Sequence, residues 1–288
     1  MQQTRGVAEL GVVFHTGMEG QMRKVLGLVG VTLLFAGPAL AADLPVKAPR
    51  AATLMPVLSW SGWYVGANAG WVGSANDTVT NTGTDTDSGG LGTGLANGAL
   101  PTSINVKYDG FIGGGQIGYN WQAGNWVFGL EADIDGASAK GSTTRIFPGG
   151  AFVPNTSTYS RELDWLATVR GRLGMTVTPS FLIYGTGGLA IGQTKIGSTE
   201  DCPLANPPCA SEPSMNTKST HTSAGWTVGA GAEWMFAPNW SLKAEYLYVD
   251  LGSHSNTIVY TYGPFTSSMT STARDTMNIV RGGINFHF

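Results

Sequence analysis

Charged residues of both signs recur at alternate positions in several stretches of the chain. They are Glu131, Asp133, Asp135, Asp164, Arg170, Arg172, Glu233, Lys243, Glu245 and Arg281. Because side chains alternate between the two faces of a β-strand, this spacing places the charges on one face and apolar neighbours on the other. If the strands that carry these charges close into a narrow barrel with this face inward, the charges could form an ion-pair and hydrogen-bond plug. Alternatively, they could line a narrow channel. An interior only wide enough for side chains makes unpaired charges costly, which favours the plug.

Other residue types that could carry chemistry form weaker patterns. Ser253 and His254 lie near Asp250, but a hydrolase triad is defined by geometry and not by nearness in sequence, so a solvated polar loop is favoured. His221 and His254 lie in stretches expected to be outer loops, where imidazoles could capture haem or a metal ion. That capture stays an alternative. The sequence predicts no catalytic residue, no cofactor site and no metal site, and therefore no enzyme.

Both cysteines, Cys202 and Cys209, lie in one polar, proline-rich stretch. An exported protein meets an oxidising compartment, which favours a local disulfide between them. On the chain-entropy account such a short loop gains about 2–3 kcal/mol, enough to rigidify a loop but not to hold a fold. Metal binding by this pair is disfavoured, because no other His or Cys stands at tetrahedral spacing.

The elements that position the charges are stretches in which apolar and polar residues alternate. Eight of them occur, near 62–72, 110–122, 125–137, 162–177, 181–195, 224–236, 240–251 and 280–288. The links between them alternate in length: those at 122–125, 178–180 and 237–239 are short, whereas those near 73–109, 138–161, 197–222 and 252–274 are long and polar. Short turns on one side and long loops on the other are typical of outer-membrane barrels. The predicted fold is all-β, an eight-stranded antiparallel up-and-down transmembrane β-barrel.

Aromatic residues stand near the ends of these stretches. Seven are expected at the end with the short turns, namely Trp63, Trp121, Trp126, Phe181, Phe236, Trp240 and Phe288. Five are expected near the other end, namely Trp71, Phe111, Trp165, Trp226 and Tyr248. Two such girdles match the two interfaces of a membrane. Phe286 and Phe288 close the last alternating stretch and are expected to anchor it at the membrane boundary.

The amino end has the features of an export signal. Met22-Arg23-Lys24 is a basic start, residues 25–36 form an apolar run in which Thr32 is the one polar residue, and Ala39-Leu40-Ala41 is a small-x-small cleavage signal. We therefore expect a signal peptide at 22–41, a proline-containing periplasmic leader at 42–59 and the barrel with its loops at 60–288. Residues 1–21 are interpreted as the result of a start codon placed too far upstream, with an unusually long n-region of the signal peptide as the alternative.

The composition agrees with this class of protein. Only 12% of the residues are charged and the net charge is −3. A soluble domain normally carries about twice that fraction of charged residues. The mildly acidic balance argues against nucleic acid as a partner, because nucleic acid selects a basic face.

Several of these segments together resemble a known family. The signal at 22–41, Trp60-Ser-Gly-Trp-Tyr-Val-Gly-Ala-Asn-Ala-Gly-Trp71, Gly225-Trp-Thr-Val-Gly-Ala-Gly-Ala-Glu-Trp234 and the ending at Phe288 are similar to the small alphaproteobacterial outer-membrane immunogenic, porin-family proteins, which are related to the OmpA transmembrane domain. The resemblance implies an eight-stranded barrel in the bacterial outer membrane, inserted by the barrel-assembly machinery and surrounded by lipid and lipopolysaccharide. It carries no catalytic residues.

The predicted function follows from the fold and the closed interior. We expect a structural and surface-interaction barrel whose loops meet host or surface ligands. Two alternatives remain: a narrow porin that passes small solutes, and a surface binder of haem or another ligand through the outer loops.

Overall fold

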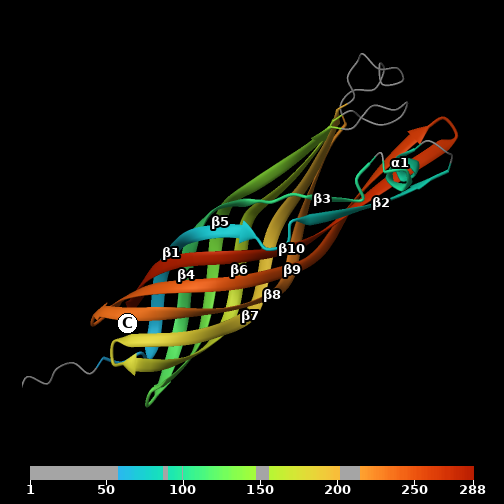
Figure 1. Ribbon diagram of the computed structural model, residues 1–288. Helices are drawn as coiled ribbons and strands as arrows, with labels where there is room; N and C mark the ends of the chain where they lie inside the picture. The colour runs from blue at the N-terminus through green and yellow to red at the C-terminus, as the bar shows by residue number, and fades with distance from the viewer. Residues whose placement is uncertain (1–57, 87–89, 99, 147–155, 202–214) are drawn as a thin grey trace, which may run out of the picture. The chain divides into compact units, whose positions relative to one another are not determined.

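The computed structural model (Figure 1) describes residues 58–86, 90–98, 100–146, 156–201 and 215–288. The predicted upstream segment, the signal peptide, nearly all of the leader, and the pair Cys202 and Cys209 lie outside these residues.

Ten strands and one short helix make up the described fold. They are β1 (Gly62–Ser74), β2 (Thr78–Asp85), α1 (Leu91–Ala96), β3 (Ser103–Asn105), β4 (Asp109–Ala123), β5 (Trp126–Ile146), β6 (Thr156–Thr178), β7 (Phe181–Asp201), β8 (Met215–Ala237), β9 (Trp240–Tyr262) and β10 (Phe265–His287). In the part of the chain that is described, no helix is long and apolar enough to cross a membrane.

Eight of the strands close a ring (Figure 1). The order is β1-β4-β5-β6-β7-β8-β9-β10, and β10 pairs back to β1 in an antiparallel ladder. This closing ladder runs from Tyr64 opposite His287 to Ser74 opposite Met277. Strand β2 continues the sheet from β10 beyond the end of β1, and β3 pairs with β2. The all-β antiparallel barrel is confirmed, with two strands more than the eight predicted.

Short turns join the strands at one end of the ring, called here the turn end. Residues 124–125, 179–180 and 238–239 connect the three hairpins β4–β5, β6–β7 and β8–β9. Gly124 has φ +61°, a left-handed backbone that glycine adopts without steric cost. These are the short links that the sequence predicts.

At the opposite end the strands are longer than predicted. Much of 138–161, 197–222 and 252–274, expected as loops, is strand, and a two-residue turn at 263–264 joins β9 to β10. This part of β5–β10, together with β2, β3 and α1, is called the extension. Its strands are rich in serine and threonine, which suit a pleated sheet but lack the strong apolar alternation demanded by lipid contact. That is why the sequence pattern made them look like loops.

Large apolar side chains cover the outside of the ring. Trp63, Trp121 and Trp126 are each about half exposed, and Phe111 and Phe288 are 70% and 73% exposed. In a water-soluble protein such a surface would be an aggregation hazard. A lipid environment removes that cost, so the band fits a membrane.

The ladders between ring strands contain several register shifts, and two of them change which residues of the interior were expected to face inward. In β6 the register with β7 shifts between Leu163 and Trp165, and in β10 the register with β9 shifts between Arg274 and Thr276. An extra residue in one strand reverses which positions face inward beyond it. As a result Leu163, expected on the outer face, is 1% exposed and lies in the interior with Leu166.

Candidate functional site

The interior of the ring is the candidate site, and it is closed at the turn end by Trp60. This side chain is fully buried and packs with Val127, Leu182, Tyr184 and Met235. Its Nε1 donates a hydrogen bond to the carbonyl oxygen of Pro179 at 3.1 Å. An aromatic residue just before β1 thus fills the interior where the chain enters the barrel.

Above Trp60 lies a cluster of buried charges, called the lumen cluster. It contains five carboxylates and four cations from five different strands, namely Glu131, Asp133, Asp135, Arg170, Arg172, Glu233, Lys243, Glu245 and Arg281. None of these residues is more than 6% exposed. The structure therefore brings together nine of the ten charges singled out in the sequence.

Two arginines hold most of the carboxylates. Arg170 places Nη2 at 2.5 Å from Glu131 Oε1 and 2.7 Å from Asp133 Oδ2. Arg281 places Nη1 at 2.6 Å from Asp135 Oδ2 and Nη2 at 2.8 Å from Glu245 Oε2. Forked guanidinium groups suit this role, because each presents several donors in one plane. The four carboxylates are therefore bridged into one network instead of separate pairs.

Arg172 occupies a second position within the lumen cluster. Its Nη2 lies 2.7 Å from Glu233 Oε2, its Nη1 donates to the Tyr64 hydroxyl at 3.0 Å, and its guanidinium lies 3.9 Å from the ring centroid of Tyr184. The Tyr64 hydroxyl in turn donates to Glu131 at 2.7 Å. One side chain thus makes an ion pair, a hydrogen bond and a cation–π contact.

Space for Tyr64 comes from a glycine on the neighbouring strand. A methyl group on Gly118 of β4 would collide with the Tyr64 hydroxyl. The glycines of residues 113–118, which resemble a nucleotide-binding fingerprint in letters only, here form a thin barrel wall.

Asp164 does not join the lumen cluster, contrary to expectation. It sits at the bulge in β6, is about one quarter exposed and pairs with Lys195 of β7. Because the bulge interrupts the alternation, its side chain leaves the inward row that Thr168, Arg170 and Arg172 follow.

An apolar layer lies next to the lumen cluster, and sequence reasoning missed it. Every ring strand except β8 contributes to it, and Tyr108 joins from just before β4; its members are Val72, Tyr108, Ile112, Ala139, Leu163, Leu166, Ala190, Leu247, Val249, Leu251, Met277 and Ile279. The available signal was the apolar run at 246–249, where both faces of β9 are apolar. A strand whose inward face is also apolar must bury that face against a packed interior.

A second buried ion pair lies beyond the apolar layer. Arg161 Nη2 is 2.6 Å from Asp275 Oδ1, and both side chains are 2% exposed. Thr194 donates to the other oxygen of Asp275 at 2.7 Å, and the guanidinium carbon of Arg161 lies 4.8 Å from the Tyr108 ring centroid. These residues fell within or next to predicted loops, so the sequence gave no reason to place them inside.

The histidine and serine candidates do not form a triad. Asp250 binds Arg274 at 2.5 Å, whereas His254 faces Asp275, with Nε2 at 3.9 Å from Oδ2. His254 stacks on His221, with ring centroids 5.4 Å apart and planes at 15°. Haem ligands on opposite sides of the iron would point end-on toward it, which this stacking does not provide. Among the described residues, no group of three or more His, Cys, Asp or Glu is arranged to hold a metal ion.

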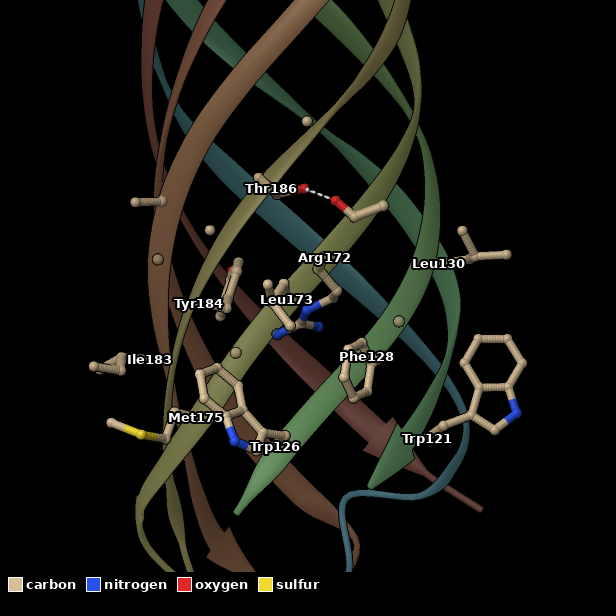
Figure 2. A pocket seen from close by; sticks show the side chains of 17 residues that line it. Trp121, Trp126, Phe128, Leu130, Arg172, Leu173, Met175, Ile183, Tyr184 and Thr186 are labelled. Atoms are coloured by element: carbon tan, nitrogen blue, oxygen red, sulfur yellow. Dashed lines mark hydrogen bonds between the residues drawn. The ribbon is translucent and has the colours of Figure 1, made fainter. Parts of the chain in front are cut away.

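The outer wall carries a hollow of about 1170 Å³ near the turn end (Figure 2). Trp121, Trp126, Phe128 and Leu173 stand around it, and small residues of β6–β8 form its floor. Arg172 belongs to the lumen side of the same thin wall. Since the hollow is apolar and faces outward within the apolar band, it offers no groups for polar chemistry.

The geometry is that of a membrane barrel with a filled interior, and comparison with known proteins identifies its family. The sequence model described as "Outer membrane protein beta-barrel domain" matches residues 29–267. The chain belongs to the outer-membrane β-barrel family.

Relatives in this family carry the same location in their names. The 31 kDa outer-membrane immunogenic protein of Brucella melitensis biotype 1 is 37% identical over 270 residues, which cover 93% of this chain and all of the relative. The 22 kDa outer membrane protein of Rhizobium leguminosarum bv. viciae is 29% identical and covers 81% of this chain and 84% of its own. These matches confirm the predicted family and the outer-membrane location.

Among solved structures, the outer membrane protein OprG of Pseudomonas aeruginosa aligns with 79% of this chain and 97% of its own. The identity is 14% and the TM-score is 0.41. A likeness at this level carries no functional argument.

Proposed function

We propose that this outer-membrane barrel is a closed structural element that presents its extension at the cell surface for interaction with other molecules. The observation that carries the proposal is the stack of filled layers across the interior. Trp60, the lumen cluster, the apolar layer and the pair of Arg161 with Asp275 follow one another along the barrel.

The lumen cluster supports closure because its charges satisfy one another. Arg170 and Arg281 have fully buried side chains, and every carboxylate of the cluster has a cation within 3 Å. Charges that line a conducting pore must stay available to water and to passing ions. Here the carboxylates are committed to partners in a ring too narrow to hydrate them separately.

The apolar layer is a second seal of different chemistry. Leu166, Leu247, Met277 and Ile279 are fully buried and reach inward from three strands. A packed apolar constriction excludes ions even when neighbouring charges rearrange. The two seals act independently, which argues against the narrow porin.

The extension supports the surface role. In β9 the strand continues for 14 residues beyond Tyr248 of the predicted girdle, a length of roughly 45 Å along the strand. Hydroxyl pairs such as Thr257 with Thr270 and Ser255 with Thr272, both at 2.9 Å, hold it across the strands. We infer that it stands outside the lipid, on the side away from the periplasm, as a sheet with polar outer faces.

The enzyme alternative gains no support from Ser253, His254 and Asp250, because Asp250 binds Arg274 and His254 faces Asp275 instead. Binding of haem or another surface ligand would be one form of the proposed surface interaction, because the extension and not the lumen would carry it.

Conductance in planar lipid bilayers tests the proposal. Purified refolded protein is expected to give at most small, rare steps. Large and steady open channels from the unmodified protein would overturn closure and establish the porin. A gel-mobility difference between boiled and unboiled samples verifies that the inserted protein is folded.

A further inference from the structure

The outer face of β4 and β5 changes from apolar to charged just beyond its last large aromatic residue. Phe111 of β4 is 70% exposed and packs edge-to-face on Trp71 of β1, with ring centroids 4.9 Å apart. Two residues closer to the extension, Asp109 lies opposite Lys140 of β5, and both side chains are exposed. Lys107, two residues before Asp109 in the chain and on the same face, is exposed as well. The charges therefore begin where the apolar band ends.

Both lysines are unpaired, although carboxylates stand nearby. Glu162 of β6 is opposite Lys140 in the strand register, but it binds Lys218 of β8, whose Nζ lies 3.2 Å from Glu162 Oε2. In the part of the chain that the structure describes, the ammonium groups of Lys107 and Lys140 form no ion pair and no side-chain hydrogen bond. Residues diagonal to each other on neighbouring strands lie about 7–8 Å apart, so the two ammonium groups can reach the same head group.

The backbone that carries Lys107 is held on two sides. On one side the N–H of the preceding Val106 donates to the carbonyl oxygen of Asp77 at 2.7 Å. On the other side a methyl group on Gly141 of β5 would collide with the carbonyl oxygen of Lys107, so the two backbones are in close contact. Binding at an ordered backbone loses less conformational entropy than binding at a loose loop.

We propose that Lys107 and Lys140 bind the phosphate groups of lipopolysaccharide in the leaflet next to the extension. Along strands tilted by about 40°, the two lysines stand roughly 5–10 Å beyond the level of Phe111, which is the depth of the polar head groups. The proposal rests on the orientation proposed above, in which the extension faces away from the periplasm. The leaflet on that side of a bacterial outer membrane carries lipopolysaccharide, a phosphorylated glycolipid.

The surroundings of the lysines suit a phosphorylated sugar. Lysine binds phosphate as a point charge, and two separate ammonium groups suit a head group that carries more than one phosphate. Ser138 and Ser142 lie on the same face of β5 as Lys140 and are exposed. Their hydroxyl groups can hydrogen-bond to sugar hydroxyls beside the phosphates. A head group with a single phosphate and no sugar uses less of this surface.

Native mass spectrometry of the refolded protein in detergent, mixed with purified lipopolysaccharide, tests the site. The double replacement Lys107→Gln with Lys140→Gln should weaken binding by about tenfold, since each cation near a membrane surface adds to the attraction for anionic lipid. Lys107→Arg with Lys140→Arg should keep the affinity. Binding by the wild type should weaken as the salt concentration rises, because both charges are exposed to solvent.

Arg145→Gln is the matched control. It removes an exposed cation from the same strand, but on the face opposite to that of Lys140, so its affinity should equal that of the wild type. Lipopolysaccharide stripped of its phosphates should bind the wild type as weakly as the intact molecule binds the double glutamine variant. Phosphatidylglycerol and inorganic phosphate at the same concentration should not displace it. The boiled and unboiled gel shift identifies any variant that fails to fold.

Equal affinity of the folded double glutamine variant and the wild type would overturn the proposal. Equal binding of phosphatidylglycerol and lipopolysaccharide would overturn it too. Neither lysine faces the interior, so both results leave the conductance test of the closed barrel unaffected. Cleavage of the extension by protease added to intact cells tests the orientation separately.

Discussion

Replacing Arg172 by methionine tests how tightly the lumen cluster is held. Methionine keeps much of the side-chain length but removes the charge and all donors. Arg172 is 2% exposed, contacts Glu233 at 2.7 Å and covers the face of Tyr184 at 3.9 Å. The change would leave Glu233, which is fully buried, without its arginine.

The expected loss of unfolding free energy follows from these contacts. Breaking one partner of a buried ion pair costs about 3–5 kcal/mol. Loss of the cation–π contact adds up to about 2 kcal/mol, though contributions that share a side chain do not add fully. Glu233 keeps hydrogen bonds from Ser241 at 2.6 Å and Asn285 at 2.7 Å, which limits its penalty. We therefore expect a loss of about 4 kcal/mol for Arg172→Met.

The assay is reversible urea unfolding in detergent micelles or lipid vesicles, followed by tryptophan fluorescence. The double replacement Arg172→Met with Glu233→Gln should recover part of the loss, because it removes the unpaired carboxylate. Arg145→Met, at an exposed arginine of β5, is the control and should stay within about 0.5 kcal/mol of the wild type. A loss below about 1 kcal/mol for Arg172→Met would refute the reasoning that the cluster is a desolvated network. Conductance should remain low in this variant, because the apolar layer is untouched.

Three further outcomes are expected. Phe288→Asp should reduce outer-membrane assembly, because Phe288 is an exposed aromatic residue at the end of β10 and its N–H donates to the carbonyl oxygen of Trp63 at 3.0 Å. Wild-type levels of heat-modifiable protein would contradict this. Gly118→Ala should lower the free energy of unfolding, measured with urea, by about 1–3 kcal/mol, because the added methyl group would displace Tyr64. The control is Gly136→Ala, where the methyl group meets nothing closer than 4.0 Å and the free energy of unfolding should change little. Burial alone would raise the pKa of Asp85, but hydrogen bonds from Ser267 and the amides of α1 outweigh it and hold the pKa below its usual range. A lowered carboxyl pKa contributes stability that is fully present above the unfolded pKa of about 3.9 and is lost as the pH falls through the folded pKa. The protection of the α1 amides, measured as their exchange rate relative to that of an unstructured peptide at the same pH, should therefore fall only in that acid range, and Asp85→Asn should remove this fall.

The sequence alone determined the membrane ring. Alternation with a period of two is a local property, and lipid demands it wherever a strand crosses the apolar band. For that reason the eight ring strands, the three short turns and the inward direction of residues such as Glu131, Arg170 and Arg281 could all be predicted. The family resemblance could also be seen in the sequence, because the motifs that carry it are short and local.

Only the tertiary structure decided what the alternation cannot encode. The bulges at Asp164 and at 274–276 shift the face of every residue beyond them, so Asp164 left the lumen cluster while Leu163 and Asp275 entered the interior. Outside the lipid the outer face of a strand need not be apolar, and serine and threonine serve strands and loops alike, so the extension could not be distinguished from loops. The meeting of His221 with His254 depends on where two strands part, and that is set by long-range pairing across the ring and not by any local sequence.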